Sequence, residues 1–298
     1  MIDSLAEKGQ EALKELSKKS QQEINDIVHQ MSMAAVDQHM HLAKLAYDET
    51  GRGIYEDKAI KNLYASEYIW NSIKDNKTVG IIGEDKQKGL TYVAEPIGVI
   101  CGVTPTTNPT STTIFKAMIA IKTGNPIIFA FHPSAQQSSK HAAKVILEAA
   151  IKAGAPKDCI QWIEIPSIEA TRQLMNHKDI ALVLATGGSG MVKSAYSTGK
   201  PALGVGPGNV PTYIEKTAHT KRAVNDIIGS KTFDNSMICA SEQVMVVDKE
   251  VYSDVVKEFK LHQTYFVNKN ELQQLEDAIM NEDKTAVKPD IVGKSAVD

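Results

Sequence analysis

Residues 180–190 read IALVLATGGSG, an unbroken apolar run that ends in a glycine-rich segment. A continuous apolar run without polar alternation is typical of a strand buried on both faces of a parallel sheet. Glycines directly after such a strand would let backbone amides approach a phosphate or a ring closely. The stretch therefore predicts a buried parallel strand and a loop suited to ligand binding. On pattern alone, tight turns in a compact protein explain the glycines equally well.

Further short runs of β-forming residues lie on either side of this strand and alternate with helical patterns. They cover residues 97–103, 126–130, 159–163 and 201–205. The segments between them have the lengths expected of crossover helices in a parallel sheet. The best defined helix is predicted over residues 134–153, with Ser134 as its N-cap and Gly154 as its stop signal. The predicted fold class is α/β with a doubly wound, mostly parallel sheet.

The two ends of the chain show different patterns. Apolar residues recur at helical spacing up to about Ile73, with an interruption at residues 51–53, so this part is predicted to be helical. After Val210 we expect a short strand, a helix, a polar segment over residues 231–241, another strand over 244–247 and two more helices.

Composition and charge exclude several classes of protein. Hydrophobic residues make up 42% of the 298 and charged residues 23%, with a formal net charge of −3, which is ordinary for a globular protein. Nothing favours nucleic acid or a membrane as partner, and no apolar run is long enough to span a bilayer. The charged N-terminus lacks the apolar core of a signal peptide. We therefore expect a cytoplasmic protein.

The three cysteines, Cys101, Cys159 and Cys239, cannot all pair and form no C-x-x-C motif, which indicates free thiols in a reducing compartment. Cys101 and Cys159 lie in or beside apolar runs and are predicted to be buried. Cys239 lies in a polar turn, where an accessible thiol would be placed. His39 and His41 are two residues apart on a predicted helix and point in different directions, so no metal site is expected.

Three loops at predicted strand ends are rich in hydroxyl, amide or glycine groups. They are residues 104–110 (TPTTNPT), 185–190 (ATGGSG) and 204–209 (GVGPGN). Ligands of open α/β sheets bind at the carboxyl ends of the strands, where these loops would lie. None of them is the G-x-G-x-x-G dinucleotide fingerprint, so the glycines alone are weak evidence.

Several motifs together resemble the aldehyde dehydrogenase superfamily. They are residues 95–100 (EPIGVI), 105–109 (PTTNP), 185–188 (ATGG), 200–202 (KPA) and 233–235 (FDN) with Cys239, in the order of that superfamily. The pattern is most similar to the CoA-acylating branch. That branch includes the N-terminal half of the bifunctional aldehyde–alcohol dehydrogenases and the monofunctional acylating acetaldehyde dehydrogenases.

The resemblance implies a fold and an activity. The fold would be the variant Rossmann fold of the family, with an NAD-binding domain and N-terminal helical segment over residues 1–228. An incomplete catalytic domain would cover residues 229–298. The activity would interconvert acetaldehyde, coenzyme A and NAD with acetyl-CoA and NADH. The chain would act on small molecules and form a homo-oligomer, a dimer or a filament in the full-length protein.

The resemblance also assigns roles to residues. Cys239 matches the nucleophile, and Asn108 matches the asparagine whose amide helps to hold the oxyanion. NAD would lie along the segment after the first core strand and against two glycines. His132 stands where many relatives place a lysine near the adenosine ribose. The implied cofactor-binding residues are Val103, Thr104, Pro105, Thr106, Thr107, Asn108, His132, Gly188 and Gly206.

One departure from the hydrolytic relatives concerns the second half of the reaction. Those relatives carry a glutamate that activates water, and the matching position here is Gly204. Without that base, the thiol of coenzyme A is the better nucleophile toward an enzyme thioester. Coenzyme A is therefore the expected co-substrate.

The sequence leaves the aldehyde and the extent of the active protein open. Another aldehyde, such as succinate semialdehyde, is an alternative substrate, and an inactive fragment with an assembly role is an alternative function. Family members continue beyond residue 298, so we expect the isolated fragment to be weakly active or inactive. Iron is expected only in a C-terminal alcohol dehydrogenase part outside this chain.

Overall fold

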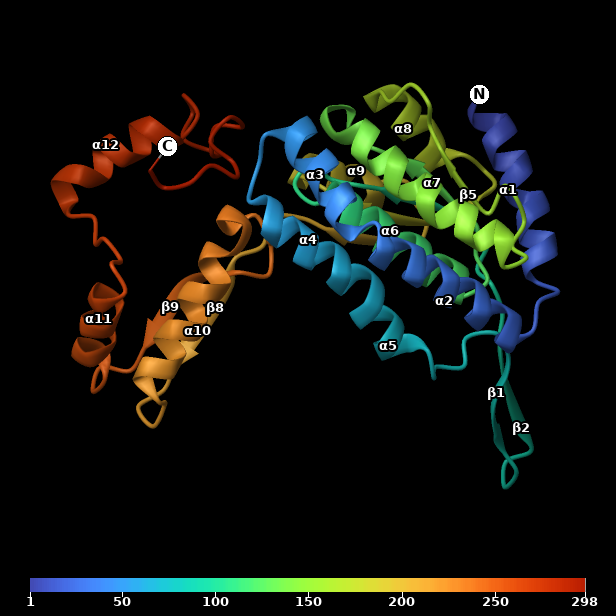
Figure 1. Cartoon of the computed structure of the whole chain (residues 1–298), viewed down its shortest axis with the longest axis horizontal. Coiled ribbons are helices and arrows are strands. Elements are labelled where there is room, and N and C mark those ends of the chain that lie inside the picture. The colour runs from blue at the N-terminus through green and yellow to red at the C-terminus, as the bar shows by residue number, and fades with distance from the viewer. Residues whose placement is uncertain (298) are drawn as a thin grey trace. The chain divides into compact units, whose positions relative to one another are not determined.

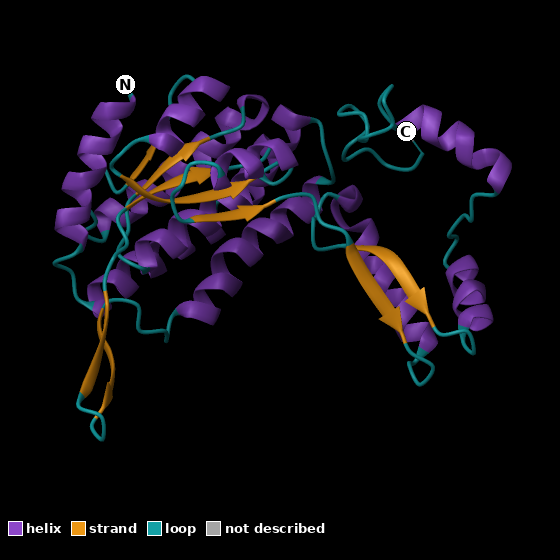
Figure 2. Cartoon of the chain, turned by 180° about the vertical axis from the view of Figure 1, so that it is seen from behind, coloured by secondary structure: helices purple, strands orange, loops and turns teal. Residues whose placement is uncertain are grey.

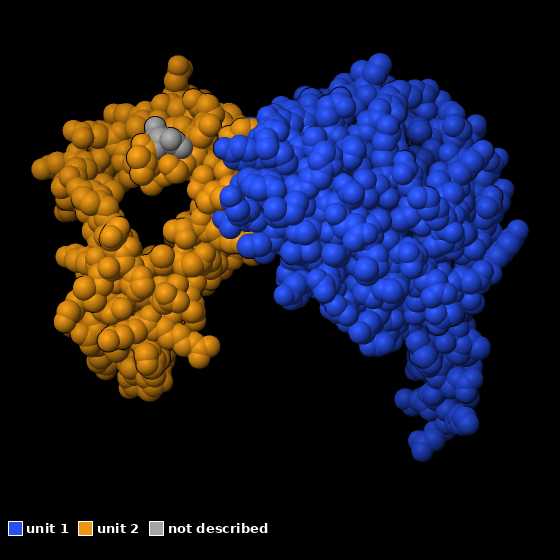
Figure 3. All heavy atoms as spheres, in the orientation of Figure 1, with its two compact units in different colours: residues 1–50, 55–207 blue, residues 51–54, 208–298 orange. Residues whose placement is uncertain are grey.

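A computed structural model describes residues 1–297 of the chain. These residues form two compact units (Figure 3). Unit 1 comprises Met1–Thr50 and Tyr55–Pro207, and unit 2 comprises Gly51–Ile54 and the chain from Gly208 onward. Units of packing need not coincide with functional domains, so the division into residues 1–228 and 229–298 stays a prediction.

The core of unit 1 is a five-stranded sheet in which every pair of neighbouring strands is parallel (Figure 2). In spatial order its strands are β5 (Ile160–Trp162), β4 (Ile127–Ala130), β3 (Val99–Val103), β6 (Ile180–Thr186) and β7 (Ala202–Val205). Each of the five predicted apolar runs yields one strand, so the predicted mostly parallel α/β fold is confirmed. The strand order reverses between β3 and β6, and such switch points are where open α/β sheets bind ligands.

The register aligns the carboxyl ends of four strands. Val103 of β3 pairs with Ala130 of β4 and with Ala185 of β6. Ala185 in turn pairs with Gly204 of β7. The loops that follow these four residues therefore leave the sheet at one edge, close to a common level.

Helices cover both faces of this sheet because its strands are apolar on both sides. On one face, Ile100, Ile127 and Phe129 pack in a core with α2 (Gln21–Asp37), α6 (Pro109–Lys122) and α7 (Gln136–Lys152). On the other face, Val99, Cys101 and Val183 pack with α1 (Ile2–Leu16), α8 (Ile168–Asn176) and α9 (Ser189–Tyr196).

The N-terminal region is helical, as predicted. After α1 and α2 come α3 (His39–Thr50), α4 (Tyr55–Leu63), a π-helical turn (Tyr64–Tyr68) and α5 (Ile69–Ile73). The predicted interruption near residues 51–53 separates α3 from α4. Gly51 and Gly53 both have positive φ there, at 60° and 75°.

The start of α7 differs from the prediction. Residues Pro133–Ala135 form a 3₁₀ turn, so Ser134 is not the N-cap of α7. Instead, the Glu49 carboxylate accepts hydrogen bonds from the backbone N–H groups of Gln137 (2.8 Å) and Ser138 (2.7 Å). A carboxylate at a helix N-terminus satisfies free N–H groups and complements the helix dipole. The predicted stop is confirmed, with Gly154 at φ 94°.

An antiparallel hairpin extends from unit 1, formed by β1 (Gly80–Asp85) and β2 (Leu90–Ala94) (Figure 1). Neither strand was predicted. Most residues of both are exposed, so the hairpin lacks the buried pattern that identified the core strands.

Unit 2 contains a parallel pair of strands, β8 (Val210–Ile214) and β9 (Glu242–Val247). Its helices are α10 (Thr220–Thr232), α11 (Tyr252–Leu261) and α12 (Lys269–Ile279). Its core consists of Ile214, Val224, Ile227, Val255 and Phe259. The strands and helices predicted after Val210 are confirmed. Within residues 1–297, none of the helices is both long and apolar enough to cross a membrane.

Candidate active site

The loop after β3 carries two threonine hydroxyl groups that are buried without a hydrogen bond to any described residue. These groups belong to Thr104 and Thr106. A buried hydroxyl without a partner costs free energy, so such groups mark places where a ligand or water completes the bonding. They follow Val103, the last residue of β3, at the switch point of the sheet between β3 and β6.

A buried lysine lies beneath this loop. Lys116 of α6 is 5% exposed, and its Nζ donates to the carbonyl oxygens of Val103 (2.6 Å) and Leu184 (2.7 Å). It thus links the ends of β3 and β6. Burial lowers the pKa of its ammonium group to about 7. The sequence reasoning missed this residue, although a lysine within an apolar helix was a visible signal.

Asn108 is the N-cap residue of α6 and is half-buried. The first turn of α6 contains Pro109, whose lack of an N–H is tolerated at that position. Helix α4 holds the loop from the side, because Lys58 Nζ lies 3.5 Å from the Thr107 carbonyl oxygen and Lys61 Nζ lies 2.5 Å from Asn108 Oδ1.

His132 follows β4 at the same edge of the sheet and is exposed. Its Nδ1 accepts a hydrogen bond from the backbone N–H of Ser134 at 3.1 Å. With Nδ1 as acceptor, a neutral ring carries its hydrogen on Nε2.

Gly188 is the N-cap residue of α9, directly after β6. A Cβ atom at this position would meet no other atom within 4 Å. The packing of the chain therefore does not require glycine there, and the open space above the backbone suits a bound molecule. The preceding residue, Gly187, donates from its N–H to the Val205 carbonyl oxygen at 3.0 Å, which ties this loop to the end of β7.

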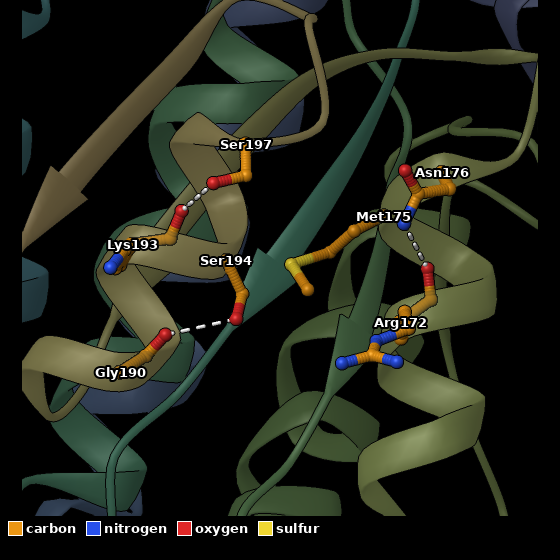
Figure 4. A pocket seen from close by; sticks show the side chains of 7 residues that line it. All are labelled: Arg172, Met175, Asn176, Gly190, Lys193, Ser194 and Ser197. Carbon is orange, nitrogen blue, oxygen red and sulfur yellow. Dashed lines mark hydrogen bonds between the residues drawn. The ribbon is translucent and has the colours of Figure 1, made fainter.

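Beside this loop, a cavity of about 380 Å³ lies between α8 and α9 (Figure 4). Its walls are Arg172, Met175, Asn176, Gly190, Lys193, Ser194 and Ser197. Both serine hydroxyls donate to carbonyl oxygens of α9, and the Asn176 amide donates to the Arg172 carbonyl oxygen. These polar groups therefore stabilise their own helices. The sequence analysis did not anticipate this cavity.

Gly204 lies near the end of β7, where it pairs with Ala185 of β6. Neighbouring side chains fill the space that a side chain at residue 204 would need. A Cβ on Gly204 would lie 2.7 Å from Val192 Cγ1 and 2.8 Å from Tyr196 Cε2. The Gly204 N–H donates to the Tyr196 hydroxyl at 3.0 Å. At Gly206, in contrast, a Cβ would make only an ordinary contact, at 3.7 Å from Val192.

Cys239 lies in unit 2, in a turn between a 3₁₀ segment (Phe233–Ser236) and β9, and is exposed. The other two cysteines are buried, as predicted, and burial raises the pKa of the Cys101 and Cys159 thiols to about 12. Exposure therefore separates Cys239 from the other thiols.

The turn that carries Cys239 is held by an unusual backbone. Asp234, Asn235 and Ser236 all have positive φ, at 49°, 49° and 64°. Such conformations are strained for non-glycine residues, although Asp and Asn tolerate them best. Asp234 is fully buried, and its Oδ1 accepts from the Ile54 N–H at 2.7 Å. Asn235 Nδ2 donates to the Gly293 carbonyl oxygen at 3.0 Å.

The predicted site residues divide between the two units. Val103, Thr104, Pro105, Thr106, Thr107, Asn108, His132, Gly188 and Gly206 lie at one edge of the sheet of unit 1, and Cys239 lies in unit 2. The sequence predicted the Asp234–Asn235 motif but not its anchors in residues 51–54 and at Gly293.

Comparison with known families agrees with this fold. Residues 1–278 match the model of the aldehyde dehydrogenase family, and the chain belongs to that family. The chain is 61% identical over 246 residues to the aldehyde-alcohol dehydrogenase of Streptococcus pneumoniae, which covers 83% of this chain and 28% of that relative.

Solved structures show the same similarity. An acetylating aldehyde dehydrogenase from Geobacillus thermoglucosidasius superposes with a TM-score of 0.94 at 48% identity, over 99% of this chain and 65% of that one. A propionaldehyde dehydrogenase from Rhodopseudomonas palustris, solved with bound CoA and an acylated cysteine, gives a TM-score of 0.86 at 31% identity. It matches all of this chain and 67% of its own. The chain spans 28% of the length of the S. pneumoniae relative, and 65% and 67% of the lengths of these two solved structures.

Proposed function

We propose that this chain is the cofactor-binding and nucleophile-bearing part of a CoA-acylating aldehyde dehydrogenase. It would interconvert acetaldehyde, coenzyme A and NAD with acetyl-CoA and NADH through a thioester on Cys239. The observation that carries this proposal is the exposed Cys239 in a turn held by buried Asp234, while the other two thiols are buried. A solved relative with an acylated cysteine and bound CoA supports the same chemistry.

The residues at the sheet edge fit a nicotinamide dinucleotide. The unpartnered hydroxyls of Thr104 and Thr106 supply polar contacts, and Gly188 leaves open space at the N-terminus of α9. His132 lies exposed after β4, and an imidazole ring can hydrogen-bond a ribose hydroxyl. When bound, NAD accepts the hydride that leaves the former aldehyde carbon.

The first half of the reaction rests on two side chains. The Cys239 thiolate attacks the aldehyde carbon and forms a C–S bond, and the carbonyl oxygen takes the negative charge. The Asn108 Nδ2 group donates a hydrogen bond to that oxygen. A single donor of this kind typically contributes about 10²–10³ in rate.

The second half transfers the acyl group to coenzyme A. The CoA thiolate attacks the thioester carbon, the bond to Cys239 breaks, and the cysteine thiolate is the leaving group. A water-activating side chain at residue 204 is excluded by Val192 and Tyr196, which fill its space. This packing supports acyl transfer to a thiol rather than hydrolysis.

We further propose that the chain works within a longer protein of the bifunctional aldehyde–alcohol dehydrogenase type. The S. pneumoniae relative is named an aldehyde-alcohol dehydrogenase, and the chain matches 28% of it. An iron-dependent alcohol dehydrogenase would then lie outside this chain.

The thioester can be tested directly. Incubation of the protein with acetyl-CoA should place an acetyl group on the peptide that contains Cys239 and on neither of the peptides with Cys101 and Cys159. Mass spectrometry of the digest reads this out. The Cys239→Ser variant should yield no acetyl thioester, and free coenzyme A should remove the label from the wild type. An unlabelled Cys239, or a label on Cys101, would refute the assignment.

A further inference from the structure

Asn108 occupies a capping position but does not cap its helix. Asparagine at an N-cap usually accepts a backbone N–H of the first turn with its side-chain oxygen. Here no such bond is present at the start of α6. Asn108 Oδ1 instead accepts from Lys61 Nζ at 2.5 Å, and Nδ2 donates to Thr107 Oγ1 at 3.2 Å. The side-chain amide is therefore held by a neighbouring helix.

The lysine decides which way the amide faces. The oxygen and nitrogen of an asparagine side chain have the same shape, so their positions follow from the hydrogen-bonding partners. An ammonium group has donors only, and it attracts Oδ1 and repels the NH₂ group. With Oδ1 held by Lys61, the NH₂ group is turned away from the lysine. One of its two hydrogens is donated to Thr107 Oγ1, and the second can be donated to another acceptor, with its N–H bond polarised by the lysine charge.

Lys61 is fixed by the docking of its whole helix. Lys58, at 3% exposure, reaches the Thr107 carbonyl oxygen, and Asn62, at 1%, accepts from the Thr110 hydroxyl at 2.8 Å. Positions 58, 61 and 62 share one face of a helix. That face of α4 thus contacts Thr107, Asn108 and Thr110, and it sets the position of the Lys61 side chain.

We infer that Lys61 is a positioning residue that turns the Asn108 amide so that Nδ2 is presented to the substrate oxygen. This inference rests on the proposed function, in which Asn108 Nδ2 holds the oxyanion. Without Lys61, the amide can rotate, or Oδ1 can turn back to cap α6, and either change removes the donor from its place. Removal of Lys61 should therefore lower the rate of the chemical step and leave cofactor binding nearly unchanged.

A double-mutant cycle in the full-length enzyme tests this inference. Asn108→Ala should lower kcat by about 10²–10³, and Lys61→Met should lower it by about 10-fold or more, because misplaced groups cost up to about 10². The KM for NAD should change little in Lys61→Met, and Lys61→Arg should restore most of kcat. In the Asn108→Ala background, Lys61→Met should have less than about a two-fold further effect. Lys77→Met, an exposed lysine beyond α5, is the matched control.

The outcomes separate the two claims. If Asn108→Ala keeps normal kcat, the proposed oxyanion role of Asn108 is wrong, and the inference falls with it. If Asn108→Ala is impaired but Lys61→Met lowers kcat equally in both backgrounds, Lys61 acts independently and the inference alone is wrong.

A second readout does not depend on turnover. With ¹⁵N-labelled asparagine, the Asn108 side-chain NH₂ signals of this chain should shift in Lys61→Met and stay unchanged in Lys77→Met. An unchanged Asn108 signal in Lys61→Met would show that the lysine does not hold the amide, and the inference would fail.

Discussion

The backbone of Gly208 lies so close to Cys239 that a Cβ on Gly208 would be 2.3 Å from the Cys239 carbonyl oxygen. The obstacle to a side chain at residue 208 is space, since this glycine has no positive φ. The backbone that precedes β8 therefore supports the turn that presents the thiol, and the two segments cannot be altered independently.

Gly208→Ala should consequently displace the Cys239 turn. We expect slower NADH formation and a changed rate of Cys239 alkylation, together with a lower free energy of unfolding by about 1–3 kcal/mol. Gly229→Ala in α10 is the control, because a Cβ there meets no atom within 4 Å. It should stabilise by up to about 1 kcal/mol. Equal rates and equal free energies of unfolding for the two variants would show that the close approach of Gly208 to Cys239 does not hold the turn.

The three thiols should differ widely in reactivity. With a pKa of about 12, Cys101 and Cys159 are thiolates in roughly one molecule in 10⁴ at pH 8, and both are also buried. Iodoacetamide should therefore label Cys239 first, as followed by mass spectrometry over time. Labelling of all three at the same rate in the folded protein would contradict the assignment of Cys239 as the accessible nucleophile.

Restoring the glutamate of the hydrolytic relatives should not restore hydrolysis. In Gly204→Glu the new side chain meets Val192 and Tyr196, so we expect a loss of about 1–3 kcal/mol in stability and no release of acetate without coenzyme A. Gly190→Ala lies in α9, the helix that carries Val192 and Tyr196, and controls for stability because a Cβ there meets no atom within 4 Å. A well-folded Gly204→Glu enzyme that produces acetate from acetaldehyde would disprove this account of residue 204.

Lys116 should make stability depend on pH. Its folded pKa, lowered by burial to about 7, lies below the ordinary value of 10.5. Between those values the unfolded chain binds more protons, so the contribution of Lys116 to the free energy of unfolding rises with pH from about 7 to about 10.5. Below pH 7 Lys116 is charged in both the folded and the unfolded chain, so burial of the charge lowers the free energy of unfolding by its largest amount there.

Urea unfolding of the wild type and of Lys116→Met at pH 6 and pH 9 measures this effect. The wild type should gain stability relative to Lys116→Met between the two values, and Lys77→Met should show no such trend. A difference that is constant with pH would mean that Lys116 keeps its ordinary pKa in the folded chain.

The central sheet was predictable because its signals are local. A strand buried on both faces leaves an unbroken apolar run, as in β6, and the glycines that follow it mark the loop. Given parallel strands, the alignment of Val103, Ala130 and Ala185 at one edge follows from topology. The exposure of Cys239 likewise followed from its polar surroundings.

The remaining features depend on partners that are distant in the sequence. The cap of α7 comes from Glu49, 88 positions before Gln137, and the anchor of Asp234 lies 180 positions away at Ile54. Neither contact leaves a periodic pattern, so a local reading assigned the cap to Ser134. The role of Lys61 was hidden for the same reason, because it appears only when α4 lies beside the start of α6.

The most direct test of the central claim is NADH formation from acetaldehyde and NAD by the full-length enzyme, with and without coenzyme A. The proposed function predicts steady turnover only when coenzyme A is present, with acetyl-CoA as the product. Equal rates with and without coenzyme A, with acetate as the product, would show that water takes the acyl group and would contradict the acylating function.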